Sequence, residues 1–301
     1  MAPDSLINLY HDMPDLTGTL SELFIYPIKS CAGVPLQQAS MTPLGLQFDR
    51  QWLIVDTEGQ FQTQREIPHL VWIEPYPSGH TLRLSAPDMP TIELPFATPT
   101  STKRKVRVWA DTLDALDMGQ TAADWLDDYL QIPNRHFRLI QFDSNATRLS
   151  DGFWCGQQRA PLQFADGFAV NVLSRASLRH FNEKLMEAGI DPVDASRFRP
   201  NLLVDGLDVH EEDLLHTVRF VTNGVPLLLE FVKHCPRCQI PNINPLTATA
   251  EPEISAMLSR YRQLPAMDNA ICFAMNAVVR TPETVVLSVN DQFEGNYRFE
   301  G

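Results

Sequence analysis

Residues 143–163, DSNATRLSDGFWCGQQRAPLQ, divide the chain into two parts with different patterning. The stretch shows neither the two-residue alternation of a strand nor the 3.6-residue period of a helix. An irregular segment of this length inside a compact protein is usually a functional loop or a domain junction. We therefore predict one domain over residues 17–142 and a second over residues 143–301.

The part before this segment is composed mainly of predicted strands. Short runs rich in β-branched and aromatic residues, such as TLSELFIYP at 19–27 and QWLIVD at 51–56, are separated by glycine, proline and aspartate. One helix is predicted over residues 121–131, with Thr121 as its N-cap and Asp124 completing a capping box. Further strands are predicted at 69–75, 81–86, 106–109 and 112–118.

The part after the segment alternates helices with strands. Ser174 starts a predicted helix over residues 174–188, and a second helix is predicted over residues 251–262. The side chains that the first helix should bury are Leu178, Phe181, Leu185 and Met186. The predicted strands are 201–205, 217–222, 225–232, 271–280 and 284–289. The expected fold is a β-rich α+β protein of two domains with a few packed helices.

The composition is that of an ordinary globular protein. A length of 301 residues allows about two domains, and 44% of the residues are hydrophobic. The net charge of −13 argues against nonspecific nucleic-acid binding, which requires positive potential. No run approaches the about 18 apolar residues of a transmembrane helix, and the N-terminus lacks the features of a signal peptide. The odd number of cysteines, five, predicts a reduced, cytoplasmic protein.

The most distinctive segment is KHCPRCQIPNINP, residues 233–245, in which Cys235 and Cys238 form a C-x-x-C pair. A zinc site would need further ligands, and no second pair is present. A thioredoxin-type pair would need a helix starting at the first cysteine, which the two following prolines disfavour. A single thiolate could instead be presented to a metal held mainly by another group, with Arg237 favouring the thiolate. Two structural cysteines at a strand end also fit the spacing.

Cationic side chains at strand ends suggest an anion site. Lys29 and Ser30 follow a predicted strand and offer a charge and a hydroxyl to a phosphate, and Arg50 directly precedes the next strand. Arg199 and Asn201 flank a proline that fixes the backbone at a strand entrance, and the arginine fork suits anions. Taken singly, each also fits a surface turn or a structural ion pair. Motifs of serine hydrolases, P-loop NTPases, HExxH metalloproteases and dinucleotide folds are absent from the sequence.

Five segments in order resemble one family. They are LSELFIYPIKSCAGVPL, GLQFDRQWLIVD, FADGFAVNVLSRASL, FRPNLLVDG and C-x-R-C-x(6)-P. Over residues 18–290 they resemble a MOSC protein with a MOSC N-terminal β-barrel domain, similar to the mitochondrial amidoxime-reducing component and to bacterial proteins that reduce N-hydroxylated bases. The resemblance implies an N-terminal MOSC-N β domain followed by a C-terminal MOSC β-barrel.

The resemblance implies a molybdenum cofactor, Mo-molybdopterin, rather than pyridoxal phosphate. Cys238 would be both the metal ligand and the catalytic residue, while Pro236 stands where relatives usually carry a serine. The cofactor-binding residues carried over by the resemblance are Lys29, Ser30, Arg50, Asp166, Gly167, Arg199, Asn201, Pro236, Arg237 and Asn276.

The activity implied by the resemblance is that of a molybdenum-dependent oxidoreductase. It would reduce N-hydroxylated compounds of the hydroxylaminopurine or amidoxime type by oxygen-atom transfer to molybdenum. The expected partners are a small N-hydroxylated substrate and a separate electron donor, a flavoprotein or ferredoxin-type protein. We expect a monomer that binds neither nucleic acid nor membranes.

Two other functions stay open on the sequence. The chain could be a non-catalytic molybdenum-cofactor carrier or a cofactor-sulfuration protein. It could also be a thiol–disulfide protein that uses Cys235 and Cys238.

Overall fold

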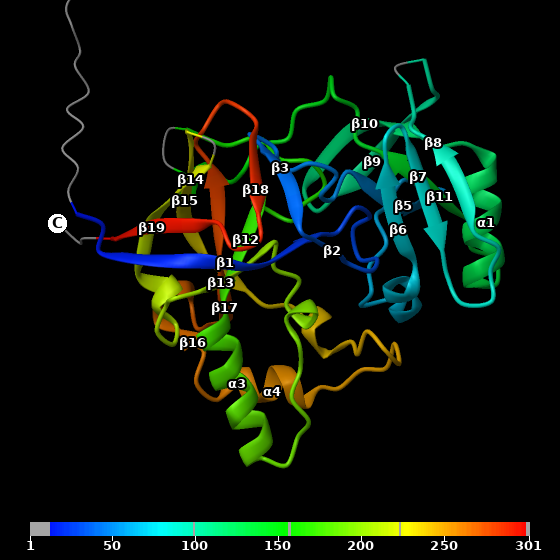
Figure 1. Cartoon of the computed structure of the whole chain (residues 1–301). Helices are drawn as coiled ribbons and strands as arrows, with labels where there is room; N and C mark the ends of the chain where they lie inside the picture. Colours follow the sequence, from blue (N-terminus) through cyan, green and yellow to red (C-terminus); the bar gives the residue numbers. More distant parts are fainter. Residues whose placement is uncertain (1–12, 99, 156–157, 223, 299–301) are drawn as a thin grey trace, which may run out of the picture.

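The computed structural model describes residues 13–98, 100–155, 158–222 and 224–298. It consists of two strand-rich bodies that lie side by side, with helices packed against the larger one (Figure 1). Within these ranges, no helix is long and apolar enough to cross a membrane. The predicted β-rich α+β class with a few packed helices is confirmed.

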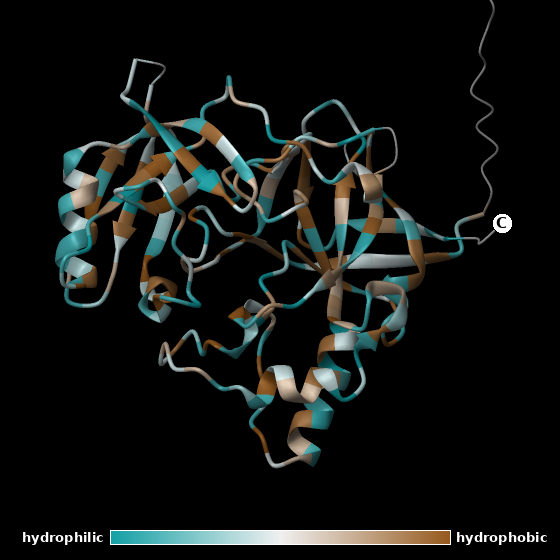
Figure 2. Ribbon diagram, turned by 180° about the vertical axis from the view of Figure 1, so that it is seen from behind, coloured by the Kyte–Doolittle hydropathy of each residue, from teal (hydrophilic) through white to brown (hydrophobic). Residues whose placement is uncertain are grey.

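The larger body is a closed barrel of seven strands. In hydrogen-bonded order they are β12 (Val170–Ser174), β13 (Leu202–Asp205), β1 (Leu16–Ile25), β19 (Gln292–Tyr297), β14 (Leu215–Thr222), β15 (Val225–Pro236) and β17 (Ala270–Val279). Antiparallel pairing of β12 with β17 joins the two ends of this order. Inward side chains such as Leu20, Leu23 and Phe293 fill the interior, and apolar and polar positions alternate along the strands (Figure 2).

The barrel takes its strands from both ends of the described chain. β1 pairs with β13 on one side and with β19 on the other. The chain then continues through β2 (Val34–Leu36), β3 (Gln38–Thr42) and β4 (Gly45–Leu46). Of these, β3 pairs with β18 (Val285–Ser288). The first strand of the sequence is therefore an integral part of the barrel.

The smaller body is built from two sheets and one helix. The four-stranded sheet has the order β5 (Trp52–Asp56), β11 (Phe137–Gln141), β10 (Asp111–Asp117), β9 (Lys103–Val108). The three-stranded sheet contains β6 (Glu74–Ser78), β7 (Thr81–Ser85) and β8 (Ile92–Pro95). Helix α1 (Gln120–Leu130) closes the core, in which Trp52, Trp125 and Leu139 are buried.

The remaining α-helices and one short strand lie beside the barrel. They are α2 (Gly152–Cys155), α3 (Arg175–Glu187), α4 (Glu253–Ser259) and β16 (Gln263–Leu264). The Ser174 hydroxyl caps α3 by accepting a hydrogen bond from the backbone N–H of Ser177. Apart from α2 and an isolated bridge between Leu149 and Pro161, segment 143–163 is irregular where it is described, as predicted.

Several local predictions were wrong, each for a physical reason. Helix α1 begins at Gln120 after Gly119, and no side chain caps it, so Thr121 is not the N-cap. Met186 is 54% exposed, because it lies on the outer side of α3 near its end. The apolar run at 69–75 is mostly a 3₁₀ helix over Pro68–Trp72. Its buried apolar side chains, Leu70 and Val71, are of the kind that also occurs in strands, which explains the wrong prediction.

Several strands were missed by the sequence patterns, among them the short β2, β3, β4, β8 and β16 and the longer β11, β12 and β19. β19 carries the sequence QFEGNY, and its small inward residue, Gly295, weakens the apolar alternation that marks a strand. β11 and β12 were also missed, although they are buried in the two cores. The helix predicted over 251–262 is shorter, since α4 covers only Glu253–Ser259.

Gly59 holds the segment that joins the two edges of the four-stranded sheet. Bridges link Phe61 to Val55 on β5 and Gln60 to Arg107 on β9. Gly59 has φ +82°, and a Cβ atom at this position would clash with the carbonyl oxygen of Lys105.

We predict that Gly59→Ala lowers the free energy of unfolding by more than about 3 kcal/mol, because the left-handed backbone and the clash both oppose a side chain. The matched control is Gly79→Ala, at φ +56° with open space around it, which should cost only about 1 kcal/mol. Urea denaturation measures both variants. Equal losses would show that the backbone conformation alone matters at Gly59.

Candidate functional site

All eleven residues predicted to form the site line one cavity of about 350 Å³. The cavity lies where the segments after β1 and before β5 meet the loop before β13, the end of β15 and the middle of β17. The residues that the structure brings together are Lys29, Ser30, Arg50, Asp166, Gly167, Arg199, Asn201, Pro236, Arg237, Cys238 and Asn276. Their proximity is a property of the fold, while their roles toward a ligand stay predictions.

Three of these residues have left-handed backbone conformations. The φ angles are +68° for Ser30, +47° for Arg50 and +53° for Arg199. Such conformations are uncommon for residues other than glycine, and they persist only where the surroundings enforce them. All three residues line the cavity, and strained backbone is common in ligand-binding sites.

Lys29 forms an ion pair across the cavity. Its Nζ donates to the carbonyl oxygen of Phe164 at 3.0 Å and to the carboxylate of Asp166, which also accepts from Trp109 Nε1 at 2.8 Å. Burial lowers the pKa of Lys29, while the Asp166 charge opposes this. Although the surrounding protein reduces hydration of Asp166, Lys29 and Trp109 hold its carboxyl pKa well below the usual range.

Arg50 and Arg199 share one aromatic ring. The guanidinium carbons lie 4.3 Å and 4.1 Å from the centre of the Tyr26 ring, within cation–π range. The carboxylate of Asp49 accepts two 2.7 Å hydrogen bonds from Arg50, whose other terminal nitrogen donates to the carbonyl oxygen of Arg199. Arg199 in turn donates to the carbonyl oxygen of Cys31 at 2.8 Å. Burial lowers the pKa of Arg199 to about 10, which leaves it charged at neutral pH.

Three amide side chains form a chain along one wall. Asn201 Oδ1 accepts from the backbone of Asn171 at 3.1 Å. The Asn171 amide donates to Met275 O and, at 3.4 Å, to Asn276 Oδ1. The Asn171 Oδ1 atom is buried and has no hydrogen-bond partner among the described residues. An unsatisfied buried acceptor costs free energy, so it indicates a donor supplied from the cavity.

The two cysteines of the C-x-x-C pair have different surroundings. Cys235 lies in β15 and accepts a 3.0 Å hydrogen bond from Arg237 Nη1, whereas Cys238 is exposed. The expectation that Arg237 supports the Cys238 thiolate therefore fails in this geometry, because its guanidinium is bound to Cys235 and to the Phe198 carbonyl. Bulges in the β15–β17 pairing, around Lys233 and Pro236, turn this segment toward the cavity.

The cavity is strongly cationic in a chain of net charge −13. One carboxylate, Asp166, and six cationic side chains line it. The six are Lys29, Arg50, Arg65, Arg199, Lys233 and Arg237. Lys29 and Arg50 already pair with carboxylates, but no salt bridge to the other four, Arg65, Arg199, Lys233 and Arg237, occurs among the described residues. These four remain to balance an anionic ligand.

Several lining residues were missed by sequence reasoning. Asn171 could have been found because it is a polar residue within an apolar strand, VNVLS. Arg65 and Trp109 carried no local signal, since they reach the cavity only through tertiary structure, and Lys233 was passed over although it begins the distinctive segment 233–245. The hypothesis of a zinc site has no geometric support, because the described ranges contain no group of three His, Cys, Asp or Glu side chains able to hold a metal.

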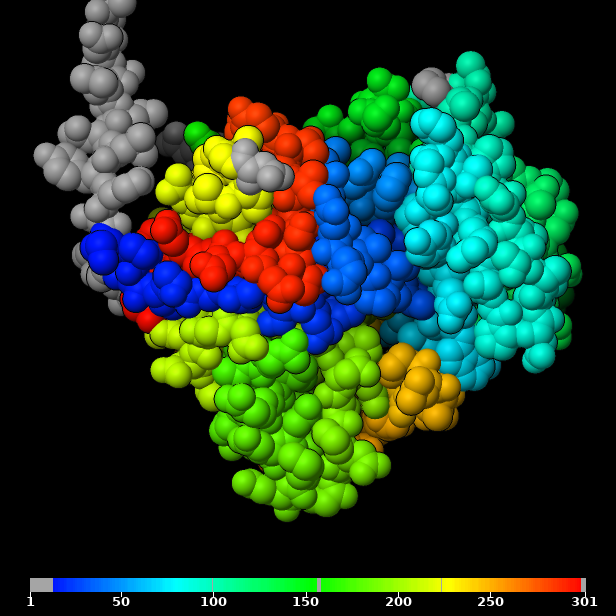
Figure 3. Space-filling view, viewed as in Figure 1, coloured from blue at the N-terminus to red at the C-terminus, as the bar shows by residue number. Residues whose placement is uncertain are grey.

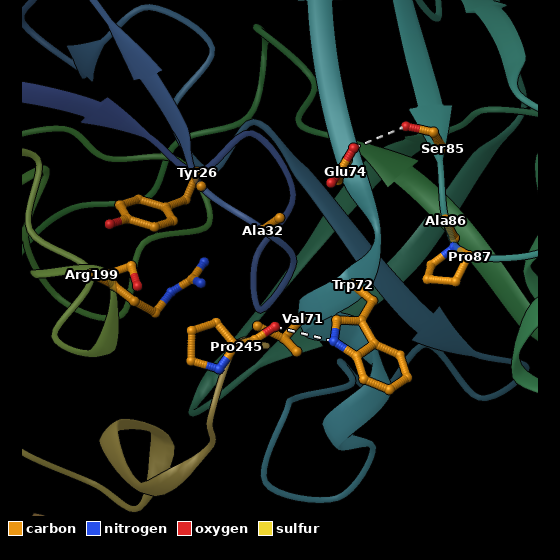
Figure 4. A pocket seen from close by; sticks show the side chains of 12 residues that line it. Tyr26, Ala32, Val71, Trp72, Glu74, Ser85, Ala86, Pro87, Arg199 and Pro245 are labelled. Carbon is orange, nitrogen blue, oxygen red and sulfur yellow. Dashed lines mark hydrogen bonds between the residues drawn. The ribbon is translucent and has the colours of Figure 1, made fainter. Parts of the chain in front are cut away.

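A second cavity of about 370 Å³ also has Arg199 in its lining. Figure 4 shows Tyr26 and Arg199 on one side of it and Trp72 with Pro245 on another. Trp72 Nε1 donates to the Pro245 carbonyl at 3.1 Å and so links the smaller body to the loop after β15. The space-filling view shows this loop, in orange, against the smaller body (Figure 3).

We predict that Asp166→Asn lowers the free energy of unfolding at neutral pH by about 1–2 kcal/mol, because Lys29 loses its partner. The loss is smaller than for a fully buried ion pair, because the Asp166 side chain is 65% exposed and solvent screens its charge. The pKa of Lys29 should fall further. Between this lowered pKa and the ordinary value of 10.5, the unfolded chain binds a proton that the folded protein has lost, so stability rises with pH over a wider range than in the wild type.

Denaturation curves between neutral and alkaline pH test this prediction. The control is Asp114→Asn, whose pair with Lys105 is 3.5 Å long and exposed on both sides, and which should change stability by less than about 0.5 kcal/mol. Identical pH profiles for Asp166→Asn and the wild type would contradict the coupling.

Comparison with known proteins places the chain in a family. The MOSC N-terminal beta barrel domain matches residues 17–133 and the MOSC domain matches residues 159–294, while the predicted boundary at 143 lies between them and stays a prediction.

Human mitochondrial amidoxime-reducing component 1 is 31% identical over 284 residues, covering 89% of this chain and 80% of that protein. Human mitochondrial amidoxime reducing component 2 is 30% identical, covering 78% and 69%. A molybdenum cofactor sulfurase from Drosophila pseudoobscura pseudoobscura is 30% identical over 82% of this chain but only 32% of its own length. The resemblance inferred from five sequence segments is thus confirmed, and the chain belongs to the MOSC-domain family that includes the mitochondrial amidoxime-reducing components.

Proposed function

We propose that this protein binds a molybdenum cofactor in the cationic cavity and reduces N-hydroxylated compounds there. The observation that carries the proposal is one exposed thiol, Cys238, on a cavity lined by six cationic side chains. A thiolate suits a soft or higher-valent metal, and arginines and lysines suit the phosphate of a pterin cofactor. The related amidoxime-reducing components support the same reading.

The donor set fits this cofactor. Cys238 would bind the metal, and Arg199, Lys233 and Arg237 would neutralise the phosphate. Buried atoms without partners among the described residues, Arg199 Nη2, Arg237 Nε and Asn171 Oδ1, offer two donors and one acceptor for polar pterin edges. Pro236 has no N–H to donate, so the neighbouring contacts must come from side chains.

When bound, the cofactor supplies two-electron oxygen-atom-transfer chemistry. The overall reaction takes an N-hydroxylated compound, two electrons and two protons to the amine or amidine and water. The chain's own residues bind the cofactor, orient it and provide positive potential. We propose that the electrons come from a separate flavoprotein or ferredoxin-type donor. The expected monomeric state and cytoplasmic location stay predictions.

A second candidate is a non-catalytic cofactor carrier or a cofactor-sulfuration protein. The similarity to a molybdenum cofactor sulfurase over 82% of this chain favours it. A carrier would bind the same cofactor through the same thiol, so cofactor content does not separate it from an enzyme. Turnover of benzamidoxime with an artificial electron donor does, because a loaded protein that never turns over is a carrier.

The thiol–disulfide alternative loses one of its requirements in the fold. Cys235 lies in strand β15 and not at a helix N-terminus, where a helix dipole would lower its pKa. Its thiol instead accepts a hydrogen bond from Arg237. A reversible Cys235–Cys238 disulfide in the cytosolic potential range would be needed to restore this reading.

We predict that Cys238→Ser removes molybdenum from the purified protein, whereas wild type and Cys235→Ser each retain roughly one molybdenum per chain, because Cys238 is the exposed thiol while the half-buried Cys235 thiol accepts from Arg237. Elemental analysis measures the metal, and benzamidoxime reduction should fall by at least about 100-fold in Cys238→Ser alone. A Cys238→Ser protein that keeps its molybdenum would sink the proposed ligand.

A further inference from the structure

A groove lies next to the cofactor cavity, and the proposed function leaves it without a role. Its volume is about 520 Å³. Arg65 and Trp109 line both spaces, so the groove continues from the cavity. Its lining residues beyond these two include Arg107 on β9, Arg135 before β11, and Phe61.

The three arginines of this groove have unused donors. Each guanidinium is positioned by one hydrogen bond to an uncharged acceptor. Arg65 donates to Thr63 Oγ1 at 3.2 Å, Arg107 to the Trp109 carbonyl at 3.2 Å, and Arg135 to Gln62 Oε1. Among the described residues none of the three forms a salt bridge. Three fixed, unpaired guanidiniums around one groove favour a bound anion with several oxygens.

Two carboxylates also line the groove, and they differ. Asp56 is occupied, since it accepts from the backbone N–H groups of Glu58 and Gln60 and from the Gln62 amide. Glu66 is exposed, and no hydrogen bond to its carboxylate occurs within the described part of the chain. The negative charge of Glu66 therefore repels a bound anion. Removing this charge should strengthen anion binding, which is the opposite of the effect of removing an arginine.

The side of the groove nearest the cavity is aromatic. Trp109 is 45% exposed, its ring lies 5.0 Å from that of Phe61, and the Arg65 guanidinium lies 4.9 Å from its centre. Its indole N–H is held by Asp166, the partner of Lys29 in the cavity. The aromatic rings of Trp109 and Phe61 thus lie between the reaction cavity and the arginines of the groove. This arrangement suits a ligand with a flat heterocycle at one end and a phosphate at the other.

We propose that the groove binds the phosphate of an N-hydroxylated nucleotide, so that the preferred substrates are nucleoside monophosphates with an N-hydroxylated base. The proposal rests on the proposed reductase function and specifies its substrate class. The exposure of Arg107 and Trp109 fits a ligand that enters and leaves with each turnover, unlike a cofactor that stays.

The experiment compares 6-hydroxylaminopurine ribonucleoside 5′-monophosphate with its nucleoside, using an artificial electron donor. The monophosphate should have a KM about tenfold lower, because a charge-assisted phosphate contact is added. Arg107→Gln and Arg135→Gln should each raise this KM about tenfold, with kcat and the nucleoside KM unchanged. Glu66→Gln should lower it. Arg83→Gln is the control, since Arg83 is also exposed and lies over an aromatic ring, 5.0 Å from Tyr76, but outside the groove.

Calorimetry with the non-reacting ligands adenosine 5′-monophosphate and adenosine measures binding without turnover. Tighter binding of the monophosphate, lost in Arg107→Gln but kept in Arg83→Gln, supports the groove even if N-hydroxylated compounds are not reduced, in which case only the proposed function fails. Equal binding of the two ligands by a protein that reduces benzamidoxime overturns the groove alone.

Two further outcomes would also overturn the nucleotide proposal. If Arg107→Gln or Arg135→Gln loses molybdenum, the groove holds part of the cofactor. If these variants slow turnover with a protein electron donor but not with the artificial donor, the groove is a docking surface for that protein.

Discussion

The cavity depends on two guanidiniums held together over the ring of Tyr26. Arg50 and Arg199 come from different parts of the chain, and their like charges would separate in water. Asp49, the π face of Tyr26 and the carbonyl oxygens of Cys31 and Arg199 together offset this repulsion. Because these contacts join the turn after β1 to the loop before β13, they fix one wall of the cavity and the junction of the two bodies.

The Tyr26 hydroxyl lies near these charges but takes no part in the hydrogen bonding. It is buried without a hydrogen-bond partner in the described structure, and burial raises its pKa to about 12. The ring therefore remains neutral and serves as a surface for the two cations. A site with this much fixed positive charge gains most from a ligand that brings several negative oxygens.

Barrel closure and site geometry are linked. β12, which closes the barrel against β17, carries Asn171, and the loop entering β13 carries Arg199 and Asn201. Bulges near the end of β15 then place Cys238 beyond the strand, where it is exposed. A closed barrel fixes its strand ends rigidly, and the left-handed turns at Ser30, Arg50 and Arg199 show where that rigidity supports strained backbone.

The sequence by itself determined the strands with clear alternation and the helix capped by Ser174, and the family resemblance supplied eleven of the residues that line the cavity. The strands and the helix follow from local signals, since each depends on neighbours within a few positions. Only the tertiary structure decided which partners these residues take. Lys29 pairs with Asp166, 137 positions away, and Arg237 binds Cys235 rather than supporting Cys238. It also decided that Arg65, Arg107 and Arg135 surround one groove. The physical reason is that hydrogen bonds and charges select partners by distance in space, which the order of residues does not specify.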